Sequence, residues 1–456
     1  MLRAMTHQRV PFWFLIANGA IVFVAFVLGI LLGRRTPLPD PQGTALHLVF
    51  QEIEKSYVDR IDGKELLDKA IASMARLDDY SRYVPQNEVA RFVEETTGTY
   101  DGIGVVLQLA EDGVFVRFPI EGGPGDRAGL LPGDRIVAVD GQSIDTLGAE
   151  QRSRVSEERL RGPSGSVVRI TVARDGASET TLEVERAAVQ RRSVKWSHWI
   201  DREQAIAYAH IADFHVGAAQ ALRQDLDALV ATEGRPMRGL VIDLRFDLGG
   251  NLDEAVSIAR MFVREGNLVS MRRRDAEVVE RFDADPTQCT YGDLALVLLV
   301  NESSASASEV VAGALQDHRR ASVVGEPTYG KGVVNTIYQW KDQPFRLKLT
   351  TARYYTPNGR NLDRGLRRDS APQTAENGNS PNSAGGVGPD RLAALDGAAE
   401  ETVRAALAEF PAPEHHLQRL TAWSKVRQMR VPGPLSLSED PQLAAALEEI
   451  RARLGK

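Results

Sequence analysis

Residues 295–332 read ALVLLVNESSASASEVVAGALQDHRRASVVGEPTYGKG. The apolar run 295–300 predicts a buried strand, and the residues that follow the serine-rich turn predict a helix. The shorter apolar run 321–325 predicts a second strand. Strand, helix and strand in this order favour a mixed α/β architecture.

The same alternation of strand and helix signals extends over residues 189–400, which we predict to form one α/β core. A stretch rich in Asn, Ser, Gly and Pro, residues 371–386, interrupts this region. Such residues cannot bury a core, so we expect a disordered surface insertion there. Residues 401–456 are predicted to be helical, because Leu443, Ala446, Leu447 and Ile450 share one helix face.

Residues 100–188 form a different kind of region, with short β-rich runs separated by glycine pairs. The motif GIGV, residues 102–105, is followed by PIEGGPGDRAGLLPGDRIVAVDGQSI at 119–144. A glycine-bounded loop can point successive backbone N–H groups at a terminal carboxylate, although GIG alone could be a simple tight turn. The two stretches together resemble the PDZ domains of bacterial processing proteases. The resemblance implies that Gly102, Ile103, Gly104 and Val105 bind the peptide.

Composition excludes several classes of protein. The 456 residues leave room for about three domains of roughly 150 residues each. The net charge of −7 disfavours a nucleic-acid-binding surface over the whole chain. Cys289 is the only cysteine, which excludes a disulfide framework, and the eight histidines show no HExxH spacing. We therefore expect no metal site.

The N-terminal region predicts a membrane anchor. Residues 12–33 carry no charge, and as a helix rising about 1.5 Å per residue they would span roughly 33 Å. The run continues directly into Arg34 and Arg35, so we expect an uncleaved anchor that follows a short tail, residues 1–11. Positive charges flank it on both sides and do not set its orientation. A polar linker, residues 34–45, then leads to a helical region, residues 46–99, that could pack on a partner subunit.

Ser306 is the candidate nucleophile, because the turn after the strand 295–300 delivers it to the start of a helix. The first amides of a helix have no partner within it, so the N–H of Ala307 could donate to an oxyanion formed by attack of the serine. A serine-rich turn in this position is, however, more often a simple helix cap.

Lys331 is the candidate general base, and a glycine flanks it on each side. Glycines allow the close backbone approach that places an amine against a serine hydroxyl. A lysine accepts a proton only when it is neutral, so burial must lower its pKa from about 10.4 toward roughly 7–8. A phosphate-binding loop is the weaker alternative, because the Gly-rich spacing of a P-loop is missing upstream.

The stretches SASASE, GEPTYGKG and DLR followed by a glycine pair resemble the carboxy-terminal processing proteases, also called tail-specific proteases. The resemblance implies a Ser/Lys dyad of Ser306 and Lys331, an oxyanion hole completed by Gly249 or Gly250, and no cofactor. Two departures from the family pattern are Asp247 and Leu248, where the family has Asn and Pro.

A third departure is Asn335, where the family has a glutamine that holds the lysine amine. The resemblance places Asn335 in the catalytic site, but its side chain is shorter by about 1.5 Å, one carbon–carbon bond. An ordinary polar residue at a strand end is the alternative interpretation. Asp243 and Arg245, at the end of another strand, are more simply explained as a structural ion pair.

We therefore expect a membrane-anchored serine endopeptidase that recruits protein substrates through their C-termini and cuts near them. The resemblance places its soluble part in the periplasm, held at the inner membrane by a single span. A homo-oligomer or an adaptor protein is a further possible partner, and no nucleic acid is expected. The alternative function is a catalytically silent scaffold that binds chain termini, which the three departures from the family pattern favour.

Overall fold

The computed structural model of the chain describes residues 41–144, 147–174, 178–274, 277–365 and 385–455. The chain divides into two compact units, Met1–Leu77 and Asp78–Lys456. The predicted tail and anchor, residues 1–33, lie outside the described residues. Among the helices that are described, none combines the length and the apolar character needed to cross a membrane.

The described part of the first unit consists of two helices, α2 (Pro41–Ser56) and α3 (Gly63–Ala75). Helix α3 begins where the carboxylate of Asp62 accepts hydrogen bonds from the N–H groups of Lys64 and Glu65. Because α2 already begins at Pro41, the end of the predicted linker, which was placed at residue 45, belongs to a helix.

The second unit begins with elements that were predicted to be purely helical but include a strand. Strand β1 (Arg82–Val84) precedes the short helices η1 (Gln86–Glu88) and α4 (Val89–Thr97). Strand β1 pairs with β18 (Arg346–Tyr355), more than 260 residues away. Three residues are too few to show a strand period, so only the pairing reveals this strand.

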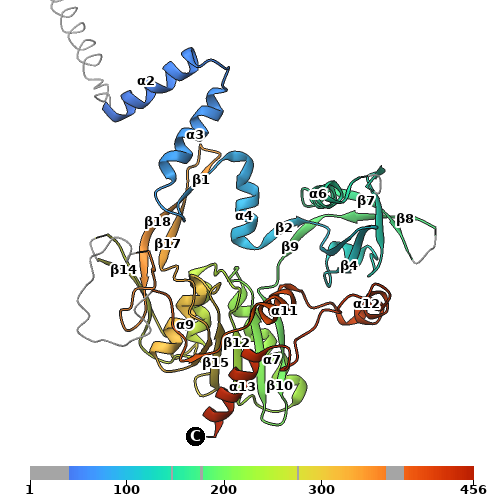
Figure 1. Cartoon of the computed structure of the whole chain (residues 1–456), viewed down its shortest axis with the longest axis vertical. Helices are drawn as coiled ribbons and strands as arrows, with labels where there is room; N and C mark the ends of the chain where they lie inside the picture. Colours follow the sequence, from blue (N-terminus) through green and yellow to red (C-terminus); the bar gives the residue numbers. More distant parts are fainter. Residues whose placement is uncertain (1–40, 145–146, 175–177, 275–276, 366–384, 456) are drawn as a thin grey trace, which may run out of the picture. The chain divides into compact units, whose positions relative to one another are not determined.

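The small β-rich domain follows, and two short strands tie its ends together: β2 (Thr99–Gly102) pairs with β9 (Ala187–Gln190). Apolar side chains of its sheet, such as Val116, Ile136 and Ile170, point into a separate core. Helix α6 (Ala149–Leu160; Figure 1) and the short helix α5 (Pro124–Arg127) complete the domain. The sheet contains β3 (Val105–Ala110), β4 (Gly113–Pro119), β5 (Arg135–Val139), β6 (Gln142–Ser143), β7 (Val167–Ala173) and β8 (Thr180–Glu185).

The protease-like core is built on a six-stranded sheet with the order β10-β11-β12-β15-β16-β19. Strand β10 is antiparallel to β11, and every other neighbouring pair is parallel. Strands β11 and β12 are buried along their whole length and are mostly apolar, as expected for parallel strands that are covered on both faces. The strands are β10 (Val194–Asp201), β11 (Ile206–Ile211), β12 (Gly239–Asp243), β15 (Ala295–Val300), β16 (Ser322–Gly325) and β19 (Arg391–Leu392).

Helices cover both faces of this sheet. Helices α7 (Ala218–Glu233), α8 (Leu252–Arg260) and α9 (Ala307–Asp317) share one apolar cluster with one face. Helices α11 (Gly397–Ala408) and α13 (Pro441–Leu454) pack on the other face. Between them, α12 (Glu414–Val426) leaves the core and packs on the β-rich domain.

A second sheet lies beside the core, with the order β1-β18-β13-β14, and β17 also pairs with β18. Its remaining strands are β13 (Asn267–Arg272), β14 (Val278–Asp283) and β17 (Val333–Gln339). The predicted insertion 371–386 falls almost wholly on residues 366–384, outside the described residues. The mixed α/β core with an inserted PDZ-like domain is thus the observed architecture.

Candidate active site

The predicted catalytic residues follow three neighbouring parallel strands. The glycine pair follows β12, Ser306 follows β15, and Lys331 follows β16. The carboxyl ends of parallel strands meet at one edge of a sheet, which is where open α/β sheets carry their sites. The sheet order therefore brings together residues that are up to 82 positions apart in the chain.

Ser306 lies in a strained turn at the N-terminus of α9. Its φ of 58° and ψ of −112° are unusual for a residue with a side chain, and it is only 8% exposed. The turn is fastened to the loop after β12, because Ser304 Oγ donates to the carbonyl of Leu244 at 2.8 Å. Asn301 Oδ1 accepts the N–H of Phe246 at 3.0 Å in the same loop. These hydrogen bonds thus keep the serine turn in its strained conformation.

Gly249 lies directly against this turn. A Cβ added to Gly249 would be 2.6 Å from the carbonyl oxygen of Ala305 and 2.8 Å from both Ala307 N and Ser306 Cβ. Its φ of +91° also favours glycine. A Cβ on Gly250 would instead meet the carbonyl oxygen of Phe214 at 2.6 Å. Of the two predicted oxyanion-hole glycines, Gly249 is therefore the one beside Ser306 and Ala307.

The N–H of Gly249 is engaged in this structure by the side chain of Asp247. It donates to Asp247 Oδ1 at 2.7 Å, while the backbone carbonyl of Asp247 accepts the N–H of Ala305 at 2.9 Å. Asp247 is fully buried, and its Oδ2 has no hydrogen-bond partner among the described residues. Burial raises the pKa of this carboxyl well above its usual range. Asp247 stands where the family has Asn. Its side chain thus accepts a hydrogen bond from the N–H of Gly249, which was predicted to serve in the oxyanion hole.

Glu309, on the first turn of α9, connects the two halves of the site. Its Oε2 accepts the N–H of Ser306 and the N–H of Lys331, each at 2.8 Å. Its Oε1 accepts the Thr328 hydroxyl and the N–H of Gly330, each at 2.6 Å. Burial raises the pKa of Glu309, and these four hydrogen bonds oppose that shift. One buried carboxylate therefore sets the spacing between the serine turn and the lysine loop.

Lys331 has the environment that a neutral amine requires. Burial lowers its pKa, and the negative charge of Glu309 partly opposes the shift. Its Nζ lies 5.2 Å from the centre of the Tyr80 ring, in a cation–π position. Within the part of the chain that the structure describes, no hydrogen bond joins Lys331 Nζ to Ser306 Oγ. The two groups are at the same site but are not in direct contact.

The expected hydrogen bond between Asn335 and the lysine amine is not found among the described residues, so the catalytic role of Asn335 stays a prediction. Asn335 lies on β17, at an irregularity in the pairing with β18, and its Nδ2 donates to Thr350 Oγ1 at 3.0 Å. Among the described hydrogen bonds, none joins it to Lys331. In this structure the side chain is held by the neighbouring strand β18.

Asp243 and Arg245 form a structural network, as their spacing indicated. Arg245 is fully buried, and its guanidinium binds Asp243 Oδ2 and Asp440 Oδ2, both at 2.6 Å. Gln442 Oε1 accepts a further hydrogen bond from it at 3.0 Å. Arg245 thus pairs with Asp243 at the end of β12 and with Asp440 just before α13. These ion pairs join the end of β12 to the C-terminal helix.

The motif GIGV lines a cavity of about 830 Å³. Gly104 has a φ of +64°, and its carbonyl accepts the N–H of Ile120 at 2.9 Å. Arg161 and Arg191 also line the cavity, and both pair with Glu94, so they join the domain to α4. The other wall comes from residues 410–414, at the start of the arm that carries α12.

Sequence reasoning missed three residues of the site. Glu309 stands three residues after Ser306, the spacing of a capping box, and this signal could have identified it. Tyr80 offered no signal, because it comes from a loop far away in the sequence. Lys348 of β18 offered none either: burial, followed by the nearby charge of Lys331, lowers its pKa to about 8.

Comparisons with known proteins identify the families that the chain resembles. The chain matches peptidase family S41 over residues 205–371 and the PDZ domain over residues 115–174. It is 34% identical to a carboxy-terminal-processing protease of Bartonella bacilliformis, over 69% of this chain and 71% of that protein. It is 29% identical to a probable CtpA-like serine protease of Staphylococcus haemolyticus, over 71% of this chain and 64% of that protein.

Among solved structures, the photosystem II D1 C-terminal processing protease is 25% identical, with a TM-score of 0.42. That match covers 78% of this chain and 94% of the other.

Proposed function

The chain belongs to the S41 family of carboxy-terminal-processing serine proteases, and from this premise we propose that it is a Ser/Lys-dyad endopeptidase with Ser306 as nucleophile and Lys331 as general base. The observation that carries the proposal is the shared carboxylate of Glu309. It binds the backbone N–H of both residues and so places a strained, helix-terminal serine next to a desolvated lysine. A serine and a neutral amine at one site are what nucleophilic acyl transfer requires.

In the proposed reaction, Ser306 Oγ attacks the scissile carbonyl carbon while Lys331 Nζ takes its proton. For this step the amine leaves the face of Tyr80 and approaches the hydroxyl to within about 2.6–3.2 Å. The protonated lysine then gives the proton to the leaving amine, and water hydrolyses the acyl-enzyme in a second, similar step.

The oxyanion of the tetrahedral intermediate would be bound by two backbone N–H groups. The N–H of Ala307 at the start of α9 is one, and the N–H of Gly249 or Gly250 is the other. Since Asp247 holds the N–H of Gly249 in this structure, the use of Gly249 requires that hydrogen bond to open. We therefore interpret this structure as the resting form of the site, in which the N–H of Gly249 is bound by Asp247.

Substrates would be recruited through their C-termini by the PDZ domain. The four residues Gly102, Ile103, Gly104 and Val105 form the connection from β2 to β3 and line the cavity, as a carboxylate-binding loop would. The substrate class that we propose is therefore a protein or peptide with a free C-terminus.

The test is degradation of a disordered protein by the full chain and by two variants, Ser306→Ala and Lys331→Ala. We expect each variant to lower the rate more than about a thousandfold, because each removes a reacting group. Lys341→Ala, at an exposed lysine, is the matched control and should retain the parent rate. Parent activity should also rise with pH until Lys331 is neutral, at a pKa below that of an ordinary lysine.

The same assay tests the catalytically silent scaffold. The closed hydrogen bond at Gly249 and the absence of a Ser306–Lys331 contact among the described residues favour that alternative. If the parent and both variants are equally inert but bind a C-terminal peptide equally well, the scaffold is correct. Activity in the parent alone excludes it.

We further propose that residues 12–33 anchor the protein in the inner membrane, with the protease in the periplasm of a Gram-negative cell. The uncharged run of 22 residues supports this proposal. Deletion of residues 1–36 should move the protein from the membrane fraction to the soluble fraction, and externally added protease should reach it only after the outer membrane is opened. Membrane association that survives the deletion would contradict the anchor.

We propose that the first unit self-associates with a second copy of the chain through α2 and α3. These helices expose apolar side chains, including Leu46, Val49, Leu67 and Met74. Charged substitutions at Val49 and Leu67 should lower the mass measured by light scattering, whereas an unchanged mass would point to an adaptor or to no partner.

A further inference from the structure

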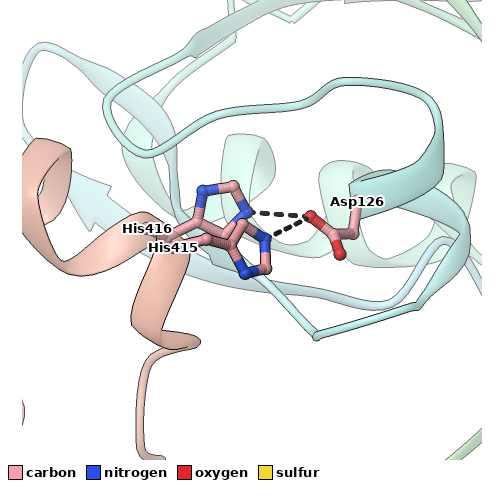
Figure 2. Close-up of side chains that lie close together, drawn as sticks. All are labelled: Asp126, His415 and His416. Carbon is pink, nitrogen blue, oxygen red and sulfur yellow. Dashed lines mark hydrogen bonds and ion pairs between the residues drawn. The ribbon is translucent and has the colours of Figure 1, made fainter.

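Three potential metal ligands meet where the C-terminal arm packs on the PDZ domain. Asp126, on α5, faces His415 and His416, the second and third residues of α12 (Figure 2). Both Nε2 atoms approach the same carboxylate oxygen, Asp126 Oδ1, at 3.2 Å for His415 and 2.9 Å for His416. One ligand atom from each residue lies within 4.8 Å of the others.

We propose that Asp126, His415 and His416 bind a divalent transition-metal ion of the zinc type, which pins α12 to the PDZ domain. Two imidazole nitrogens and a carboxylate oxygen are a ligand set that zinc uses, with water in the fourth position. Ligand atoms about 2.0–2.1 Å from a tetrahedral ion lie about 3.3 Å from one another. The observed separations from Asp126 Oδ1 are close to this value, so a small outward movement would admit the ion.

The three side chains are already held in place for such a site. Asp126 Oδ2 accepts the N–H of Gly122 at 2.9 Å, which leaves Oδ1 to face the histidines. His416 is buried, and its backbone N–H donates to the carbonyl of Pro413 at 2.9 Å. The His415 side chain is 51% exposed, so one side of the cluster is open to water. A metal ion could therefore enter from solvent without disturbing the fold.

Other contacts also join α12 to the PDZ domain, and the ion would add to them. Trp423 of α12 packs against Phe115, with ring centres 5.8 Å apart. Arg427 binds Asp112 at 2.8 Å at the end of the same helix. Residues 410–414, directly before the two histidines, line the peptide cavity. An ion at this site would thus fix one wall of the peptide-binding groove.

The test is Zn²⁺ binding to the full chain after removal of metal with a chelator. We expect one Zn²⁺ per chain by elemental analysis after dialysis, and tight binding in a competition titration with a chromophoric chelator. His415→Gln and Asp126→Asn should each weaken this binding by at least about a hundredfold, because even outer-shell changes carry about 10–100-fold. Co²⁺ bound to the parent should show the strong visible absorption of a tetrahedral site, and the variants should lose it.

His47→Gln is the matched control, since His47 is an exposed histidine in the other unit. It should bind Zn²⁺ as the parent does. His415 is largely exposed, so its variant should fold, and thermal unfolding in chelator checks this for each protein. Equal Zn²⁺ uptake by the parent and His415→Gln, or no uptake by the parent, would show a hydrogen-bonded cluster without metal. Because the readout is metal binding, the result is independent of protease activity.

Discussion

At the scale of single residues, the site contains two buried carboxylates that differ in how many hydrogen bonds they accept. Glu309 accepts four hydrogen bonds, and each joins α9 to the serine turn or the lysine loop. Asp247 accepts one hydrogen bond on Oδ1, and its Oδ2 has no partner among the described residues. The first residue organises the site, whereas the second stores unfavourable free energy beside it.

Glu309→Gln should reduce catalysis with little change in substrate binding. The amide nitrogen of glutamine would face N–H donors where a carboxylate oxygen now accepts, so the serine turn and the lysine loop would move apart. A displacement of about 1 Å lowers the rate about a hundredfold. We expect kcat to fall by this order while KM stays within about twofold. A variant with the parent kcat would show that this carboxylate does not position the dyad.

Asp247→Asn should stabilise the protein at neutral pH. The folded-state pKa of Asp247 is raised, so folding favours its protonated form. The carboxyl therefore contributes its full stabilisation to the folded protein below the unfolded pKa of about 3.9. This stabilisation is lost as the pH rises toward the folded-state pKa. Asparagine has the same shape and does not ionise. We expect the variant to exceed the parent by about 1–3 kcal/mol at pH 7–8.

Urea unfolding at acidic and alkaline pH measures this difference. The gap between variant and parent should shrink as the pH falls toward the unfolded pKa, because the parent carboxyl is then protonated in both states. A gap that does not depend on pH would mean that Asp247 does not titrate as its burial implies.

At the scale of elements, the site is made by three strand ends and the helix that follows one of them. The loops after β12, β15 and β16 each contribute a part, and none of them carries the chemistry alone. The loop after β12 approaches the start of α9 closely, because no Cβ fits between Gly249 and Ala305.

Gly249→Ala should therefore inactivate the enzyme. The new methyl group would lie 2.6 Å from the carbonyl oxygen of Ala305, so the serine turn must move. The positive φ adds about 1–3 kcal/mol of backbone strain. We expect a loss of activity of at least about a hundredfold. Gly217→Ala separates the two causes: it has a similar φ of +94° but open space around it. If both variants lost activity to a similar extent, the loss would be due to backbone strain at a positive φ and not to the contact with Ala305.

At the scale of the whole molecule, the C-terminal segment connects the core to the PDZ domain. Helices α11 and α13 belong to the core, and α12 between them packs on the PDZ sheet. Arg117 of the PDZ strand β4 binds Glu409, just after α11, at 2.7 Å. One continuous segment thus contacts both the core and the PDZ domain, and residues 410–414 of it line the cavity.

Trp423→Ala should loosen this connection. Trp423 packs against Phe115, and it lies so close to Gly133 that an added Cβ would be 2.7 Å from its ring. Loss of the ring should release α12, and hydrogen exchange over residues 414–426 should rise while exchange in α13 stays unchanged. Leu417→Ala, on the exposed side of α12, is the control. Unchanged exchange in α12 would show that other contacts hold the arm.

Much of the fold and of the candidate site could be predicted from the sequence. The apolar run 295–300 and the turn after it predicted a strand followed by a helix, and β15 and α9 have these positions. The family pattern directed attention to Ser306 and Lys331. Strand β1 was missed, because three residues carry no readable period and its pairing depends on a strand more than 260 residues away.

The sequence by itself determined the larger elements of the core and their order, because these depend on local periodicity. Its short motifs indicated the PDZ-containing S41 family and the two residues proposed to react. Only the tertiary structure decided which side chains meet: the four donors around Glu309, the strand partner of Asn335, the unpartnered oxygen of Asp247, and the approach of Asp126 to two histidines almost 290 residues away. Contacts of this kind follow from the order of strands in a sheet and from the path of the chain between them, and no local pattern encodes either.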